Sequence, residues 1–243
     1  MKKITIIGLF ILLGITTFAL NFSIYPTKFE LDLSKSSVQE VYIVNNTDLP
    51  LRIGIAPESD KNFGEDYNLN SNIKVFPKTV SIKPAGKQVV RFRVTPDKNI
   101  KEGEYKSYIT FTEIPPKIKT SNENSDTIKS EVQMITAIMI SVYGQGEKAI
   151  LDGSIKEIST RFENGVLLLT GKAYSKGNTS LKFDYSIDGK NIDSKGRIGI
   201  SPRTGENSIS TSINLPNAKK GDKIDLTIKD QTGKTYYNKK ITL

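Results

Sequence analysis

The sequence has 243 residues and a net charge of +9, with 37% hydrophobic residues and no histidine, cysteine or tryptophan. Catalytic triads, cysteine nucleophiles and ordinary zinc sites need an imidazole or a thiolate, so this composition excludes them. No pair of acids is marked out for carboxylate catalysis, and we expect a protein that is not an enzyme and uses no metal or cofactor.

The N-terminus has the layout of a secretory signal peptide. A basic start, Met1–Lys3, precedes the apolar run Ile4–Leu13, and Thr17-Phe18-Ala19 offers a cleavage site of small residues. We predict a signal peptide over residues 1–19, with an uncleaved membrane anchor as the alternative. Export predicts a periplasmic protein that is stable without disulfides.

Residues 20–144 are dominated by short segments that alternate between apolar and polar residues, as strands do. Pro26 interrupts the first segment, which predicts an edge strand or a strand that switches sheets. The polar segments 58–72 and 117–130 are expected to be loops. The expected strands are Phe22–Leu33, Val38–Val44, Leu51–Ala56, Ile73–Phe76, Thr79–Ile82, Gln88–Val94 and Tyr105–Ile114.

The stretch Val132–Tyr143 reads VQMITAIMISVY and is apolar on both faces of a predicted strand. One interpretation is a central strand covered on both sides within its own molecule. The other is a strand that keeps one face or a free edge for a partner chain. One face carries Val132, Met134, Thr136, Ile138 and Ile140, and the other carries Gln133, Ile135, Ala137, Met139 and Ser141.

Gly144-Gln145-Gly146 is expected to be a hinge, beyond which a second β domain begins. Its Asp188-Gly189 and Thr232-Gly233 pairs are typical of hairpin turns. The number and spacing of strands predict an all-β chain of two immunoglobulin-like sandwiches, over residues 20–144 and 145–243. The expected strands are Ala149–Ile158, Val166–Tyr174, Leu181–Ile187, Arg197–Ile200, Ser208–Leu215, Lys223–Lys229 and Thr235–Thr242.

Three motifs of the first half resemble the first domain of the periplasmic pilus and fimbrial assembly chaperones. The chain opens with SIYPTKFEL at Ser23–Leu31, continues with PKTVSIKPAGKQVVRFRV at Pro77–Val94, and has GEYKSYITF at Gly103–Phe111 followed by Ile114-Pro115-Pro116. The resemblance covers about Phe22–Tyr143. The second half resembles the family in position and number of strands.

The resemblance implies a chaperone that donates a strand to a pilus subunit lacking its own last strand. Strand addition of this kind takes its affinity from backbone hydrogen bonds and its register from alternate side chains. Residues 132–143 are then the donor strand. The candidate subunit-binding residues, from both faces, are Val132, Met134, Ile135, Ile138, Met139 and Ile140.

The resemblance also implies two cations in the cleft between the domains, which anchor the carboxylate at the subunit's C-terminus. Lys28 falls at the first of these positions. The second is expected on the last strand, but Met139–Tyr143 carries no charge. Lys28 is therefore the one anchor residue that the sequence assigns.

The expected partners are pilus or fimbrial subunits, with an outer-membrane usher as a further candidate and self-association through the donor strand as another. The lysines are spread along the chain without a dense basic run, so nucleic acid is not expected as a partner. No small-molecule substrate is expected either. The alternative function is a structural or adhesive surface protein built of immunoglobulin-like modules. A donor strand with a covered edge would favour this alternative.

Overall fold

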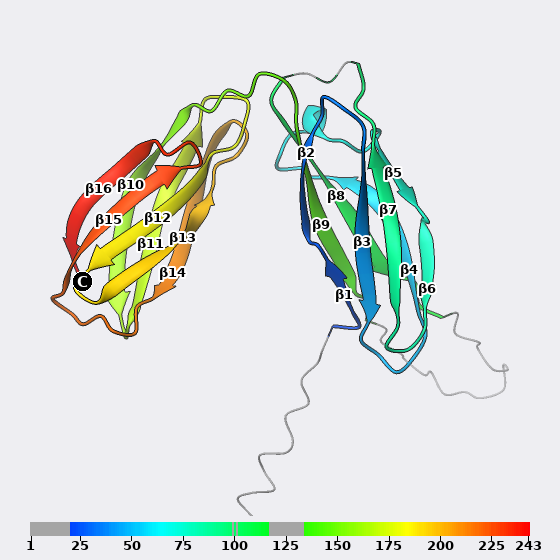
Figure 1. Ribbon diagram of the computed structural model, residues 1–243, viewed down its shortest axis with the longest axis horizontal. Helices are drawn as coiled ribbons and strands as arrows, with labels where there is room; N and C mark the ends of the chain where they lie inside the picture. The colour runs from blue at the N-terminus through cyan, green and yellow to red at the C-terminus, as the bar shows by residue number, and fades with distance from the viewer. Residues whose placement is uncertain (1–19, 99, 101, 117–133) are drawn as a thin grey trace, which may run out of the picture.

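The computed structural model describes residues 20–98, 100, 102–116 and 134–243. It consists of two β-sandwiches joined at one end (Figure 1), so the predicted all-β fold is confirmed. The signal peptide predicted over residues 1–19 and the loop predicted over residues 117–130 lie outside the described residues. In the described part of the chain, no helix is long and apolar enough to cross a membrane.

The first sandwich packs a four-stranded sheet, β1-β3-β7-β5, against a five-stranded sheet, β2-β9-β8-β4-β6. A single turn of 3-10 helix, η2, interrupts the predicted loop 58–72. The elements are β1 (Phe22–Tyr25), β2 (Lys28–Asp32), β3 (Ser37–Asn45), β4 (Leu51–Ser59), η2 (Glu65–Tyr67), β5 (Ile73–Phe76), β6 (Thr79–Ile82), β7 (Lys87–Val94), β8 (Glu104–Glu113) and β9 (Ala137–Gln145).

The first predicted segment divides at Pro26 and contributes to both sheets. Strand β1 pairs antiparallel with β3, whereas β2 pairs parallel with β9 in the opposite sheet. Proline has no N–H to donate to a ladder, so the chain changes sheets at this residue. The predicted switch is confirmed, and β2 reaches β9 only from Ser141 onward.

Strict alternation along the strands builds the first core. In β7, Val90, Phe92 and Val94 are each 1% exposed, while Arg91 and Arg93 face solvent. The same period places Ile140 and Val142 of β9 in this core and turns Met139 outward. The fold therefore explains why the face of β9 with Ile140 and Val142 is apolar. It does not explain why the outward face, with Met139, is apolar as well.

The end of β9 differs from the hinge predicted at Gly144–Gly146. Gly144 and Gln145 continue the strand, pairing with β8 on one side and β2 on the other. A side chain at Gly144 would come within 2.8 Å of Leu33, so glycine is needed here for close packing rather than for flexibility.

The second sandwich pairs β10-β11-β14 in one sheet and β13-β12-β15-β16 in the other, around a separate core. Hairpins connect β12 to β13 and β15 to β16. Thr232-Gly233 lies in the second turn as predicted, but Asp188-Gly189 ends β12 and pairs with Ile192 and Asp193, so the first turn is formed by Lys190-Asn191. The strands are β10 (Gly153–Glu163), β11 (Val166–Ser175), β12 (Lys182–Gly189), β13 (Ile192–Ile200), β14 (Gly205–Asn214), β15 (Lys223–Asp230) and β16 (Thr235–Thr242).

We predict that Phe111→Ala lowers the free energy of unfolding of the first sandwich by about 3–5 kcal/mol, because Phe111 is fully buried and leaves a cavity. Its neighbour Thr110 points to the other face, where its hydroxyl donates to Glu58 at an exposed site. Thr110→Ala should cost less than about 1 kcal/mol. Urea denaturation of both variants measures the difference, and equal losses would contradict this core assignment.

Candidate functional site

Strand β9 has a free backbone edge along its first half. The amide of Ser141 donates to the carbonyl oxygen of Thr27, just before β2. Amide directions alternate along a strand, so those of Ala137 and Met139 point to this same side, away from β8. Among the described residues, no strand pairs with this side of β9 before Ser141. We call the segment Ala137–Ile140 the open edge.

Apolar side chains lie exposed along the open edge and just before it. Met134 is 88% exposed, Ile135 is 54% exposed and Met139 is 55% exposed. Large apolar side chains gathered beside an unpaired strand edge indicate a surface that binds another strand. The open edge therefore offers both a backbone ladder and apolar contacts to a partner.

The predicted subunit-binding residues do not all lie on this surface. Ile140 is fully buried in the first core, and Ile138 is partly buried against it. Residues 134–136 precede β9 without strand structure. Val132 lies outside the described residues. Met134, Ile135 and Met139 are thus the predicted residues that are accessible in the free chain.

Lys28 begins β2 at the point where the open edge ends. It lies opposite Ser141 in the parallel ladder, and its ammonium group is 4.9 Å from the centre of the Tyr143 ring. A partner strand paired with the open edge would lie end to end with β2, in front of its first residue, Lys28. The end of such a strand would meet the Lys28 side chain.

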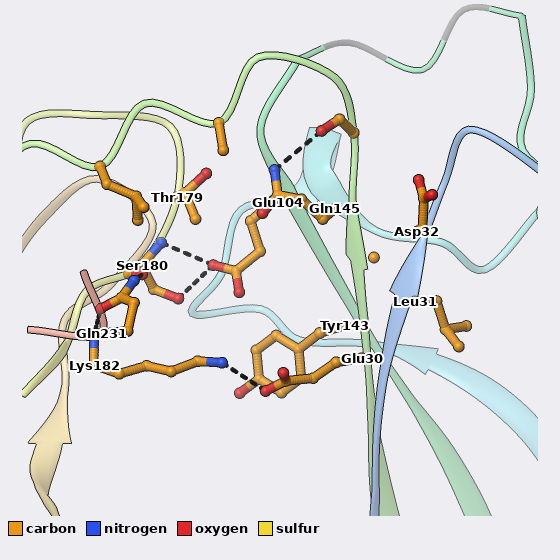
Figure 2. Close-up of a pocket in the computed structure, with 14 residues that line it drawn as sticks. Glu30, Leu31, Asp32, Glu104, Tyr143, Gln145, Thr179, Ser180, Lys182 and Gln231 are labelled. Atoms are coloured by element: carbon orange, nitrogen blue, oxygen red, sulfur yellow. Dashed lines mark hydrogen bonds and ion pairs between the residues drawn. The ribbon is translucent and has the colours of Figure 1, made fainter. Parts of the chain in front are cut away.

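A cleft of about 390 Å³ lies between the two sandwiches, next to these residues. Figure 2 shows Glu30 and Tyr143 of the first sandwich facing Ser180, Lys182 and Gln231 of the second. All five side chains are polar, and two of them carry charge. Leu31, Ala149 and Leu151 also line the cleft, so it offers a small ligand polar groups beside an apolar surface.

The Glu30 carboxylate is bound by lysines of both sandwiches. Its Oε1 atom is 2.7 Å from Nζ of Lys182 and 2.5 Å from Nζ of Lys28 (Figure 2 shows the Lys182 contact). Hydrogen bonds from Lys182 and then Lys28 lower the pKa of Glu30 from 4.5 to about 2. One carboxylate is thus shared by two ammonium groups.

The ring of Tyr143 contacts the ammonium groups of two lysines. The ammonium group of Lys106 is 5.2 Å from the centre of its ring, in addition to that of Lys28. Lys106 contacts Asp60 at 2.6 Å and the Tyr108 hydroxyl at 3.0 Å. Burial disfavours its charged form, but these hydrogen bonds outweigh burial and raise its pKa. Burial also raises the pKa of Tyr143.

Hydrogen bonds fix the two sandwiches to each other beside the cleft. The buried Glu104 carboxylate accepts hydrogen bonds from the amide and the hydroxyl of Ser180 (Figure 2). Arg203 donates to the carbonyl oxygens of Glu104 and Glu102 and stacks 3.5 Å from the centre of the Tyr67 ring. The walls of the cleft are therefore held in place by the buried Glu104–Ser180 contact within its lining and by Arg203, which is not part of that lining.

Sequence reasoning missed Lys182, Glu30 and Tyr143. Lys182 belongs to the second sandwich, and nothing in its local sequence indicates a neighbour more than 150 positions earlier. Glu30 and Tyr143 become adjacent through the parallel pairing of β2 with β9, which no local turn specifies. The quoted motif Ser23–Leu31 contains Glu30 but gave no reason to single it out.

Within the described residues, no group of three or more acidic, histidine or cysteine side chains could hold a metal ion.

A family model of the pili and flagellar-assembly chaperones, PapD N-terminal domain, matches residues 21–142. No curated protein matches the sequence. Among solved structures, the E. coli chaperone DraB is 14% identical, with a TM-score of 0.47 over 91% of this chain and 98% of that chain. The CupB2 chaperone of Pseudomonas aeruginosa is 10% identical, with a TM-score of 0.47 over 91% and 100%. A Salmonella enterica complex of the SafA pilin with the SafB chaperone contains a chain that is 11% identical, with a TM-score of 0.47 over 93% and 98%.

We predict that the contribution of Glu30 to stability disappears at low pH. Its pKa is lowered in the folded protein, so the charged form adds stability above about pH 4.5, and that stability is lost as the pH falls toward about 2. Glu30→Gln should therefore have a lower urea midpoint than wild type at pH 7 and nearly the same midpoint at pH 2. Glu163→Gln, at an exposed ion pair of the second sandwich, serves as the control. A difference between Glu30→Gln and wild type that stays constant over this range would contradict the assignment.

Proposed function

Because this chain belongs to the pili and flagellar-assembly chaperone family, we propose that it holds pilus subunits by adding the open edge of β9 to their incomplete sheet. The observation that carries this proposal is the open edge of β9, which no strand among the described residues pairs on the side away from β8, with exposed Met139 beside it. Strand addition satisfies backbone groups on both chains and covers apolar surface that would otherwise aggregate.

The position of Lys28 determines the direction of the bound strand. Strand β2 runs parallel to β9 and starts at Lys28. A subunit strand that ends in its carboxyl terminus at Lys28 has to occupy the same line, upstream of β2, and so also runs parallel to β9. Its carboxylate would then accept a charge-assisted hydrogen bond from the Lys28 ammonium group.

Met134, Ile135 and Met139 supply accessible apolar contacts to the subunit in this proposal. Ile138 is partly buried at the margin of the core and Ile140 is fully buried. Both side chains therefore hold the open edge against the core of the first sandwich and do not contact the subunit directly. Val132 would extend the donor segment beyond the described residues. The chain acts by binding, without catalysis, and the signal sequence predicted at residues 1–19 directs it to the periplasm.

We predict that Met139→Pro reduces subunit capture about tenfold. Proline removes the amide that points to the open edge but leaves the pairing with β8, whose hydrogen bonds use the neighbouring residues. The loss of one backbone hydrogen bond at an interface corresponds to about a tenfold change. The measurement is the amount of fibre subunit that co-purifies with the tagged protein from the exported fraction of its native host.

Met139→Ala is the matched control, because it keeps the amide while removing the side chain. It should retain more subunit than Met139→Pro. Equal capture by Met139→Pro and wild type would exclude strand addition at this edge. If no subunit is captured by wild type while fibres are being made, a structural surface protein becomes the better interpretation.

Loss of the Lys28 charge should shorten the lifetime of the complex with the subunit. Lys28→Met removes the charge but keeps much of the apolar stem, and we expect about three- to tenfold faster dissociation, as for a partly exposed ion pair. Lys74→Met, on the opposite sheet, is the control and should dissociate like wild type. Dissociation rates measured by exchange with labelled subunit test this, and equal rates for both variants would count against the anchor.

A further inference from the structure

Beyond the predicted signal peptide, the sulfur atoms of this chain are confined to the predicted donor strand. The sequence has three methionines, Met1, Met134 and Met139, and no cysteine. Met134 is 88% exposed and Met139 is 55% exposed, and none of the buried apolar side chains within the described residues is a methionine. Methionine is therefore not used here to fill gaps in a core. Both copies lie on the surface that a subunit covers in the proposed function.

We propose that Met139, with Met134 as a second target, is a reversible oxidation site whose sulfoxide switches off subunit capture at the open edge. This inference rests on the proposed function and adds a means of regulating it. The oxidant is hydrogen peroxide. The thioether sulfur attacks one peroxide oxygen, the S–O bond forms as the O–O bond breaks, and the other oxygen leaves with both protons as water.

The same site can be restored by reduction. A methionine sulfoxide reductase takes two electrons and two protons from a pair of thiols, the sulfoxide oxygen leaves as water, and the thiols become a disulfide. The chaperone itself holds no cysteine. Neither direction of this reaction therefore makes or breaks a disulfide within it.

The composition directs peroxide to these two side chains. Thioethers and thiols are the groups that this oxidant modifies, and their susceptibility follows their exposure. The chain lacks cysteine altogether, and it also lacks histidine and tryptophan, which stronger oxidants attack. Peroxide can reach Met134 and Met139 in the folded protein without any opening of the cores. The first chemical effect of peroxide on the mature protein therefore falls on the predicted donor strand.

The sulfoxide is tolerated by the fold because Met139 lies on the outward face of β9. Across the ladder it pairs with Thr110, whose hydroxyl donates to Glu58 at an exposed site. The new sulfoxide oxygen keeps water as its partner in this polar setting. A subunit that covers Met139 removes that water, and burial of an unpaired polar group opposes binding. Oxidation therefore weakens capture while leaving the free chaperone folded.

Oxidation acts on the side chain of Met139 and leaves its backbone amide in place. The amide still points to the open edge and can still donate to a partner strand. The expected loss of capture is about tenfold, as for one polar group left unpaired at an interface. A bound subunit should in turn shield Met139, so oxidation acts on the free chaperone and spares a complex that has already formed.

The test compares capture by the mature protein before and after treatment with hydrogen peroxide. Catalase removes the peroxide before the subunit is added. The probe is the fibre subunit that co-purifies with wild type, released in urea and diluted into free chaperone, and the complex is quantified by size-exclusion chromatography. Wild type should lose about tenfold of its capture and regain it after treatment with the two methionine sulfoxide reductases, one for each epimer, and dithiothreitol. Mass spectrometry of peptides locates the added oxygen.

Each variant is compared with itself before and after peroxide, so that its basal capture does not enter the result. Met139→Leu has no sulfur at the open edge, and peroxide should change its capture by less than about twofold. Met134→Leu should keep most of the sensitivity of wild type. Met139→Gln carries a permanent polar group, and it should capture as weakly as oxidised wild type with or without peroxide. Thermal melting confirms that the variants and oxidised wild type are folded.

Three outcomes would overturn the oxidation switch while strand capture stands. The first is a sulfoxide at Met139 with capture unchanged, or no sulfoxide there in the free chain. The second is an equal loss of capture by peroxide-treated Met139→Leu and wild type. The third is a loss that persists after the thioether has been restored, which would show damage in place of a switch.

Two other outcomes would overturn the proposed function together with this inference. Equal rates of Met139 oxidation in the free chaperone and in the isolated complex would show that the subunit does not cover the open edge. Failure of untreated wild type to capture the subunit would have the same consequence.

Discussion

The division of the first strand between two sheets is the constraint on which the rest of the site depends. Because the chain leaves one sheet at Pro26 and joins the other at Lys28, β2 covers β9 only from Ser141 onward. A continuous first strand would stay in one sheet and could not divide the edge of β9 in this way. The switch therefore creates the open edge, puts a cation at its end, and turns Glu30 toward the second sandwich.

The strands themselves could be read from the sequence because alternation is a local property. Val90, Phe92 and Val94 share one face of β7 wherever that strand lies in the fold, and a proline such as Pro26 interrupts the backbone hydrogen bonds of any strand that contains it. The end of β9 could not be read in this way. Gly144 looked like a hinge because glycine commonly permits a turn, but here it makes room for Leu33, a residue more than 100 positions away.

The same distinction between local and long-range information applies to the site. Lys28 was predicted because it lies within a motif that resembles a known family, and an apolar stretch on both faces drew attention to β9. Alternation alone could not say which face was buried, because both Ile140 and Met139 are apolar; the register with β8 decides that Ile140 enters the core. Lys182 depends on how two sandwiches pack together, and no pattern within one strand records that.

Two contacts between the sandwiches, one at Glu104 and one at Glu30, differ in burial and therefore in strength. Glu104 is buried and satisfied by two hydrogen bonds from Ser180, and breaking them would leave a charge unpaired in a dry environment, which is costly. Glu30 is about half exposed, where an ion pair contributes only about 0–1 kcal/mol. The buried contact can therefore hold the two sandwiches together while the exposed one exchanges. The rigid joint between the sandwiches and the contact that can exchange are therefore separate groups in this chain: Glu104 with Ser180 forms the first, and Glu30 with Lys182 forms the second.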